Sequence, residues 1–264
     1  MEIIAEVGSN WNNLQDCLKS IEIAKSCGAK AVKFQLYTSR ELYGRERKIK
    51  NELPRVWLKN LFNLAKRTEI EFMCTAFSPD GYRAIDSMVE RHKIASAEIT
   101  HLDILKQVNE FRKPVILSTG GAKIKQVDDA LKILKDCKVT IMFCVADYPA
   151  KIIDFRYLTL LKEVFGNNYG YGFSDHSVDV LNIPIIAKNH KCDILEKHVN
   201  LTDQKDTPDA PHSLSQDEFK LMIDNIKDST TVIDTESLAN KSMKELWQRR
   251  KLKDEFGQTG FYRP

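Results

Sequence analysis

The segment Gly172-Phe-Ser-Asp-His-Ser177 and the later segment Leu195-Glu-Lys-His198 each place a histidine where an apolar run ends. Residues 178–189 between them predict a helix, and residues 192–198 predict a short strand. A strand, a helix and a second strand in this order form a parallel pair whose carboxyl ends meet at one edge of the sheet. We therefore expect both imidazole rings at that edge, where α/β enzymes hold their active sites and where two rings can share one metal ion.

Short apolar runs of the same kind recur along the chain, and amphipathic stretches separate them. The eight runs are residues 3–7, 31–34, 71–75, 92–94, 114–117, 140–144, 169–173 and 194–198. Each run is followed by a helical pattern, such as residues 14–26, after which Gly28 provides a stop signal. Eight strand–helix units within about 220 residues predict a (β/α)8 TIM barrel of the α/β class, because a doubly wound open sheet more often has about five or six strands.

The repeat also indicates where the domain ends. We expect the barrel to occupy residues 1–236, with its last helix over residues 219–233 after the capping-box sequence Ser215-Gln-Asp-Glu218. Residues 237–264 predict a short, basic, helical tail that is too small for a second domain. The longest stretch between a strand and its helix, residues 36–61, predicts an extended loop over the carboxyl edge of the barrel.

Composition limits the classes of function. The chain has 264 residues, of which 42% are hydrophobic, and this suits one large domain. Its 40 Lys and Arg residues are dispersed among 37 Asp and Glu residues, so we expect no nucleic-acid partner. None of the six cysteines has C-x-x-C spacing, which indicates reduced thiols and no structural zinc. The N-terminus lacks a signal-peptide pattern and no apolar stretch reaches ~20 residues, so we expect a cytoplasmic protein without membrane contact.

Polar residues lie where the strands of a barrel are usually apolar. In the first strand, alternation turns Glu6 toward the barrel interior or its mouth, opposite to its neighbours Ala5 and Val7. A buried carboxylate needs a partner, and Lys33 at the end of the second strand is a candidate, with Gln35 on the same face. This set predicts either an active-site group or a structural ion pair that closes the barrel, and the residues alone leave both open.

Similar polar residues follow the next strands. They are Thr75, Lys93 with Ser96 and Glu98, the segment Ser118-Thr-Gly-Gly121, and Ser174. We expect all of them at the carboxyl edge of the barrel, because each ends or follows a predicted strand. Ammonium groups, hydroxyls and the backbone amides of a glycine-rich turn are the donors that anions require. Together they predict a site for a phosphate or a phosphorylated carboxylate.

Seven segments of this sequence resemble the successive signature segments of the sialic acid synthase (N-acetylneuraminate synthase) family. They are Ile4-Ala-Glu-Val-Gly-Ser-Asn10, Gly28-Ala-Lys-Ala-Val-Lys-Phe-Gln35, Cys74-Thr-Ala-Phe-Ser78, Lys93-Ile-Ala-Ser-Ala-Glu98, Lys113-Pro-Val-Ile-Leu-Ser-Thr-Gly120, Gly172-Phe-Ser-Asp-His-Ser177 and Leu195-Glu-Lys-His198. The resemblance covers residues 3–233 in matching order and spacing. It implies condensation of phosphoenolpyruvate with an N-acetylated hexosamine such as N-acetylmannosamine, which gives a nine-carbon 2-keto acid and phosphate.

The resemblance also implies roles for individual residues. His176 and His198 would ligate a divalent cofactor metal, Mn²⁺ or Mg²⁺, which polarises the sugar aldehyde. Glu6 and Glu98 would be the catalytic carboxylates that position groups and move protons. The residues implied to bind phosphoenolpyruvate are Lys33, Thr75, Lys93, Ser96, Ser118 and Ser174, and those implied to contact the sugar are Gln35, Tyr148 and Asp209. Members of the family form homodimers, so the resemblance implies a second copy of this chain as a partner.

Three residues depart from the family pattern in ways that bear on the substrate. Trp11 stands where a histidine is usual and predicts an aromatic wall in the sugar pocket. Ala146 stands where an asparagine usually contacts phosphoenolpyruvate, so one contact to the anion is lost. His212 is an additional polar residue in the loop after the eighth strand.

The largest departure from the family pattern is the length of the chain. Typical members continue into a small antifreeze-like domain that supplies an arginine to the partner's sugar site, and we expect no such domain after residue 236. Arg249, Arg250 or Arg263 would be the substitutes, although a charge run of this kind is more commonly a solvated surface. Two alternatives therefore stay open: a non-catalytic barrel that binds a sugar or a partner protein, and a phosphoenolpyruvate aldolase acting on a phosphorylated sugar, which the basic residues from Arg40 to Lys50 would suit.

Overall fold

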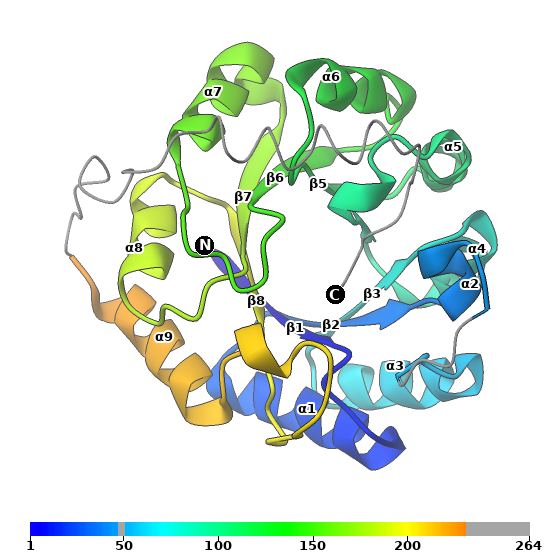
Figure 1. The fold of residues 1–264 in the computed structure, drawn as a ribbon, viewed down its shortest axis with the longest axis vertical. Coiled ribbons are helices and arrows are strands. Elements are labelled where there is room, and N and C mark those ends of the chain that lie inside the picture. The colour runs from blue at the N-terminus through cyan, green and yellow to red at the C-terminus, as the bar shows by residue number, and fades with distance from the viewer. Residues whose placement is uncertain (47–50, 231–264) are drawn as a thin grey trace.

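Eight parallel strands close into a barrel in the order β1 to β8 (Figure 1). They belong to a computed structural model that describes residues 1–46 and 51–230. The strands are β1 (Glu2–Gly8), β2 (Ala31–Leu36), β3 (Glu71–Ala76), β4 (His92–Ile94), β5 (Val115–Ser118), β6 (Val139–Cys144), β7 (Gly170–Asp175) and β8 (Ile194–His198). β1 pairs with both β2 and β8, and this register sets Glu6 beside Lys33 and His198. The prediction of a (β/α)8 TIM barrel is confirmed.

Helices alternate with the strands and surround the barrel (Figure 1). They are α1 (Leu14–Cys27), α2 (Ser39–Tyr43), α3 (Leu58–Arg67), α4 (Pro79–Ile85), α5 (Leu102–Phe111), α6 (Ile124–Ile133), α7 (Arg156–Phe165), α8 (Asn182–Asn189) and α9 (Gln216–Asp228). Short 3-10 helices are η1 (Arg55–Trp57), η2 (Asp86–Met88), η3 (Ser96–Glu98), η4 (Gly166–Asn168) and η5 (Ala210–His212). Helix α1 ends at Gly28, whose φ of 97° is the left-handed conformation that glycine adopts at low cost. Helix α9 begins with the predicted capping box, in which Ser215 and Glu218 each bond the other's backbone N–H.

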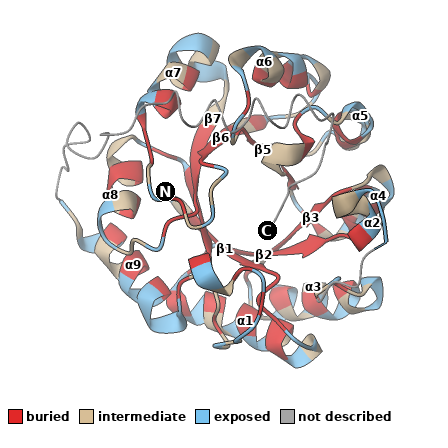
Figure 2. Ribbon diagram, viewed as in Figure 1, coloured by how far each residue is buried: buried red, intermediate tan, exposed pale blue. Residues whose placement is uncertain are grey.

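Buried apolar side chains form two separate cores. The ribbon in Figure 2 is coloured as buried along most of the strands, whereas the helices carry both buried and exposed residues. The larger core fills the space between strands and helices and includes the aromatic cluster of Phe143, Phe155 and Phe173. The smaller core lies inside the barrel and consists of Ile4, Ala31, Met73, Ile116, Met142 and Ile194. Two positions further along the same strands come Glu6, Lys33, Thr75, Ser118, Cys144 and Glu196. Because side chains alternate along a strand, the apolar layer is the floor and these residues stand on it toward the barrel mouth.

The helix predicted over residues 178–189 begins later, where α8 begins. The ammonium group of Lys197 donates to the backbone carbonyl oxygens of Ser177 and Asp179 at 2.8 and 3.1 Å, so these carbonyls are bonded by a side chain. The carboxylate of Asp179 in turn accepts the backbone N–H groups of residues 181–183 and caps the helix. The predicted start was wrong because a lysine on β8, distant in sequence, holds this loop.

Two other predicted segments differ from the structure. Residues 36–61, predicted as an extended loop, contain α2, η1 and the start of α3, while residues 47–50 lie outside the described residues. The last helix, predicted over residues 219–233, is α9 and ends at Asp228. The predicted tail over residues 237–264, and with it the domain boundary after residue 236, also lies outside the described residues and stays a prediction.

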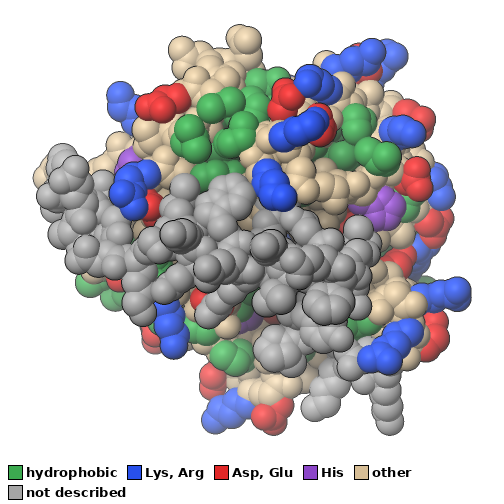
Figure 3. All heavy atoms as spheres, turned by 45° about the horizontal axis from the view of Figure 1, so that its top comes forward, with side chains coloured by type: hydrophobic (Ala, Val, Ile, Leu, Met, Phe, Trp, Pro, Cys, Tyr) green, Lys and Arg blue, Asp and Glu red, His purple; other side chains and the backbone are tan. Residues whose placement is uncertain are grey.

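The charged side chains on the surface and the state of the cysteines agree with what the composition predicts. On the face drawn in Figure 3, blue Lys and Arg side chains lie among red Asp and Glu side chains. In residues 1–46 and 51–230, no helix has both the length and the apolar character needed to cross a bilayer. All six cysteines lie within these ranges as free thiols.

Candidate active site

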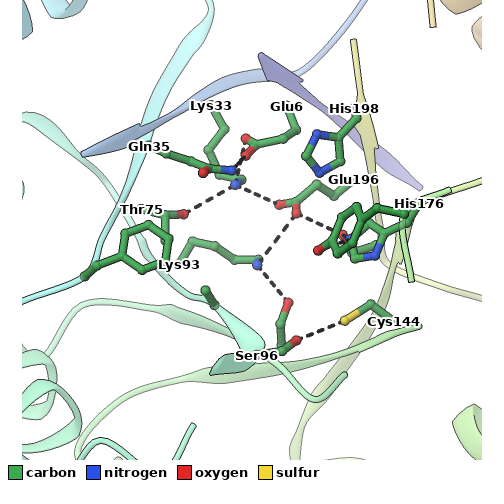
Figure 4. Close-up of a pocket in the computed structure, with 15 residues that line it drawn as sticks. Glu6, Lys33, Gln35, Thr75, Lys93, Ser96, Cys144, His176, Glu196 and His198 are labelled. Atoms are coloured by element: carbon green, nitrogen blue, oxygen red, sulfur yellow. Dashed lines mark hydrogen bonds and ion pairs between the residues drawn. The ribbon is translucent and has the colours of Figure 1, made fainter. Parts of the chain in front are cut away.

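The carboxyl ends of the strands surround a pocket in the mouth of the barrel (Figure 4). Every strand, or the loop that follows it, contributes to the lining, which consists of Glu6, Lys33, Gln35, Thr75, Phe77, Lys93, Ala95, Ser96, Ser118, Cys144, Tyr148, Ser174, His176, Glu196 and His198. All the site residues predicted from the sequence belong to this lining except Glu98 and Asp209. Strand alternation and parallel order are therefore sufficient to bring most of the predicted residues together.

Lys33 is the centre of a buried charge network. Its ammonium nitrogen lies 2.7 Å from Oε2 of Glu6 and 3.6 Å from Oε2 of Glu196. It also donates to Oγ1 of Thr75 at 3.3 Å, and the amide of Gln35 donates to Oε1 of Glu6 at 2.6 Å. The predicted pairing of Glu6 with Lys33 is confirmed. Burial lowers the pKa of Lys33, but Glu196 and Glu6 outweigh burial and raise the pKa, so this lysine stays cationic.

Glu196 is the charged residue of the pocket lining that the sequence analysis did not select. Its carboxylate lies 3.6 Å from the ammonium groups of both Lys33 and Lys93, and it accepts a hydrogen bond from Ser174 at 2.9 Å. Burial alone would raise its pKa, but the two lysines and the serine lower the pKa to about 2. A signal for this residue was present in the sequence, because it alternates with His198 and so shares its face of β8.

Lys93 and two serines form the wall contributed by β4 and β5. The ammonium group of Lys93 donates to Oγ of Ser118 at 2.7 Å, and burial lowers the pKa of this lysine below its ordinary value. Oγ of Ser96 accepts the backbone N–H of Gly120 at 2.9 Å and lies 3.0 Å from the sulfur of Cys144. A Cβ at position 120 would collide with that sulfur, so this turn requires glycine for its close approach.

His176 is held in one tautomer. Its Nδ1 donates to the carbonyl oxygen of Val145 at 2.6 Å, while Nε2 faces Oγ of Ser174 at 3.1 Å and the hydroxyl of Tyr148 at 3.4 Å. Burial lowers the pKa of His176 to about 3, so the ring is neutral. Because Nδ1 carries the proton, Nε2 carries the lone pair and turns it toward these two hydroxyl groups, which is the form of the ring that accepts a proton or binds a metal ion.

His198 belongs to a second group, together with Asp209 and His212. One possible ligand atom from each lies within 4.8 Å of the others, in the part of the chain that the structure describes. Nδ1 of His198 and Nε2 of His212 are buried without a hydrogen-bond partner. These residues fit a divalent cation, because imidazole nitrogen and carboxylate oxygen are common ligands of such ions. The metal prediction paired His198 with His176, which is not a member of this group.

The model of one protein family, the NeuB family, matches residues 20–237. The chain belongs to the NeuB family. This membership confirms the resemblance to sialic acid synthases that the seven sequence segments carry.

Relatives in the NeuB family are similar over most of this chain. Pseudaminic acid synthase of Helicobacter pylori is 31% identical over 261 residues, which cover 89% of this chain and 76% of the relative. The crystal structure of spore coat polysaccharide biosynthesis protein SpsE of Bacillus subtilis has a TM-score of 0.77 and 30% identity, and the match covers 93% of this chain and 72% of that one. The crystal structure of N-acetylneuraminic acid (sialic acid) synthetase from Leptospira borgpetersenii has a TM-score of 0.80 and 26% identity, with 95% and 92% covered.

None of the three residues that depart from the NeuB family pattern, Trp11, Ala146 and His212, lines the pocket. The indole N–H of Trp11 donates to the carbonyl oxygen of Gly8 at 3.2 Å, and its ring packs edge-on against Trp57 with centroids 5.6 Å apart. Trp11 is therefore part of the packing beneath its loop, and the prediction of an aromatic wall in the pocket was wrong. Ala146 is exposed and also lies outside the lining.

Glu98, predicted from the NeuB family resemblance to be catalytic, lies in η3 and is not part of the pocket lining. The residue is only 4% exposed. Burial, with a smaller contribution from Glu41, raises its pKa to about 7. Its catalytic role stays a prediction, but its carboxyl group titrates near neutral pH.

The Glu98→Gln substitution is expected to stabilise the protein more at pH 8 than at pH 5. The difference in the free energy of unfolding between the variant and wild type should be about 2 kcal/mol larger at pH 8. The reason is that a carboxyl with a raised folded pKa binds its proton more tightly in the folded state, so wild-type stability falls as pH rises from the unfolded pKa through about 7. Urea unfolding of both proteins at the two pH values measures the difference. The exposed Glu90→Gln variant is the control, and an equal effect of Glu98→Gln at both pH values would contradict the raised pKa.

Proposed function

We propose that this chain is a synthase that joins phosphoenolpyruvate to the aldehyde of an N-acetylated hexosamine resembling N-acetylmannosamine. The products are a nine-carbon 2-keto acid of the sialic acid type and phosphate. The observation that carries the proposal is one pocket lined by two buried lysines, four serine and threonine hydroxyl groups and two neutral histidines. Relatives named pseudaminic acid synthase and sialic acid synthetase support it.

The anion site is formed by the lysines and the hydroxyls around them. Phosphoenolpyruvate carries a carboxylate and a phosphate, and such groups bind where ammonium, hydroxyl and backbone N–H donors converge. The hydroxyl donors are those of Thr75, Ser96, Ser118 and Ser174. Glu196 keeps Lys33 and Lys93 oriented toward one another before the anion enters, because it lies 3.6 Å from both.

Two carboxylates beside Lys33 have pKa values shifted in opposite directions. Burial and the neighbouring Glu196 raise the pKa of Glu6 above its ordinary value, although Lys33 opposes them, whereas the pKa of Glu196 is lowered to about 2. A pair of acids separated in this way commonly divides the roles of proton carrier and fixed charge. Glu6 is therefore the proton carrier of the proposal, and an arriving anion favours its protonated form further.

The proposed reaction forms one C–C bond, and at C2 it replaces the C–O bond to phosphate by a C–O bond to the oxygen of water. C3 of phosphoenolpyruvate attacks the aldehyde carbon, and the aldehyde oxygen takes a proton from Glu6. Water then adds to C2 and returns one proton to Glu6, and the tetrahedral intermediate loses hydrogen phosphate to leave the 2-keto group. A divalent ion, which His198, Asp209 and His212 could hold, would supply Lewis-acid polarisation of the aldehyde. The lysines hold the phosphate throughout and favour its departure as an anion.

A phosphate-release assay tests this function. The expected result is phosphate release that requires both phosphoenolpyruvate and one member of a panel of N-acetylhexosamines in the presence of Mn²⁺. Release with a phosphorylated sugar instead would favour an aldolase of that class. Phosphoenolpyruvate binding without release for any sugar would contradict the synthase and favour a non-catalytic barrel.

Changing Lys93 to methionine is expected to lower kcat/KM for phosphoenolpyruvate by about 10²-fold, because one charge-assisted contact to the anion is lost. Since burial lowers the pKa of this lysine, wild-type kcat/KM is also expected to fall at a pH below the ordinary lysine value of about 10.4. The Lys93→Arg variant keeps its charge, so its alkaline decline should move to higher pH. Identical pH profiles for wild type and Lys93→Arg would show that another group causes the decline.

A further inference from the structure

We infer that His212 is a ligand of the metal ion, which His198, Asp209 and His212 hold together at the carboxyl end of β8. Two imidazole nitrogens and one carboxylate oxygen form a site for a first-row transition ion such as Mn²⁺, in preference to Mg²⁺. The inference deepens the proposed function and rests on it for the role of the ion, although binding itself is measured without substrates.

The three side chains are close enough to share one ion, because one possible ligand atom from each lies within 4.8 Å of the others. Nδ1 of His198 lies 3.8 Å from Oδ2 of Asp209, and Nε2 of His212 lies 3.5 Å from Oδ1 of the same carboxylate. Both separations are too long for good hydrogen bonds. Ligand atoms about 2.1 Å from one ion lie roughly 3.0 to 3.5 Å from each other at angles between octahedral and tetrahedral. The two imidazole–carboxylate separations are close to this range, and side-chain movements that bring the ligand atoms of the two imidazoles nearer than 4.8 Å would close the shell.

Burial explains why these residues need an ion. The exposed fractions of His198, Asp209 and His212 are 4%, 0% and 5%. A buried nitrogen that has lost water without gaining a partner costs free energy, and here two such nitrogens flank one carboxylate. An ion bound between them would use both lone pairs and balance the buried negative charge. Gly8 leaves the space for this carboxylate, since a Cβ at that position would overlap Oδ2 of Asp209.

The loop that carries Asp209 and His212 is fixed to the end of β1. Oγ of Ser213 donates to the carbonyl oxygen of Asp209 at 2.6 Å, and the side-chain amide of Asn10 donates to that same Oγ at 2.7 Å. Oγ1 of Thr207 donates to Oδ1 of Asn10 at 2.7 Å. The backbone N–H of Ser9 donates to Oδ2 of Asp209 at 2.9 Å. These bonds hold the proposed ligands in place before an ion arrives, as hydrogen bonds around metal ligands commonly do.

The donor atoms indicate the class of ion. Mg²⁺ prefers oxygen ligands and retains several waters, whereas a site with two imidazoles binds first-row transition ions better, and Mn²⁺ is the one among them that also suits carboxylate and water ligands. Three protein ligands also leave positions open for water or a substrate oxygen. Of the three proposed ligands, His198 also lines the pocket, so it connects the metal site to the space proposed for the sugar aldehyde.

Mn²⁺ titration of the metal-free full chain, followed by the electron paramagnetic resonance signal of free Mn²⁺, tests the inference without any substrate. Wild type is expected to bind one Mn²⁺ per chain, and His212→Gln is expected to weaken binding by at least about 10-fold. His190→Gln is the matched control, because His190 follows α8 at the opposite end of the barrel. If His212→Gln binds Mn²⁺ as tightly as wild type does, the inference is overturned, whatever the affinity of His176→Gln in the same assay.

Two further measurements distinguish ligation from an effect on folding. Pulsed electron paramagnetic resonance of bound Mn²⁺ should show one fewer coordinated imidazole nitrogen in His212→Gln than in wild type, and equal numbers would overturn the inference. Mg²⁺ at about 100-fold excess should displace little Mn²⁺, and displacement at near-equal concentrations would overturn the stated preference. If Mn²⁺ binds as expected but no sugar leads to phosphate release, the metal site stands and the proposed function fails.

Discussion

Replacing Lys33 with methionine is expected to lower the free energy of unfolding by about 3 to 5 kcal/mol. The ammonium group of Lys33 lies against two buried carboxylates, 2.7 Å from Glu6 and 3.6 Å from Glu196. Glu6 would retain the amide of Gln35 and Glu196 would retain Lys93, but the cation they share would be lost. Urea unfolding near pH 8 measures the loss.

The pH dependence and a second substitution test the cause. Without Lys33, the folded pKa of Glu6 should rise further, so the folded state binds a proton more tightly and the variant loses stability as pH rises. The loss relative to wild type should therefore be smaller at pH 5 than at pH 8. The double variant Lys33→Met with Glu6→Gln should recover part of the stability, because a neutral amide replaces the unpaired carboxylate. A double variant as unstable as the single one would indicate that lost packing, not charge, is responsible.

His198→Ala is expected to reduce turnover by about 10³-fold or more, with only a small change in stability. His198 is the residue that connects the pocket to Asp209 and His212, and its ring contacts those of Tyr148 and His176. Removing its ring should therefore weaken the polarisation of the aldehyde and change the positions of the neighbouring rings of His176 and His212. Because it lies at the end of β8 above the apolar floor, the core of the barrel is unchanged.

The phosphate-release assay and thermal unfolding measure the two effects. His190→Ala is the matched control, because that ring stacks on Phe155 outside the pocket. Excess chelator should abolish wild-type turnover in the same assay. Full activity of His198→Ala, or full wild-type activity in chelator, would contradict the proposed use of a metal ion.

The local sequence pattern was sufficient to predict the architecture and many of the residues that line the pocket. Apolar runs followed by helical stretches predict a parallel barrel, because a parallel strand pair needs a crossover helix on one side. Alternation along the first two strands turned Glu6, Lys33 and Gln35 to one face, and the barrel brings them into contact. His176 and His198 were found because each ends its strand or directly follows it. All of these properties depend on neighbours a few residues away.

Contacts between residues that are distant in sequence were determined only by the tertiary structure. Alternation turns Glu196 inward, but only barrel closure and stagger place it between Lys33 and Lys93. His212 lies in a loop without periodicity, and it reaches Asp209 and His198 because hydrogen bonds to the end of β1 set the path of that loop. Trp11 turned away from the pocket for the same reason, since its position depends on packing against Trp57. Periodicity determines the face on which a residue lies, whereas closure of the barrel and the hydrogen bonds of its loops determine what that residue meets there.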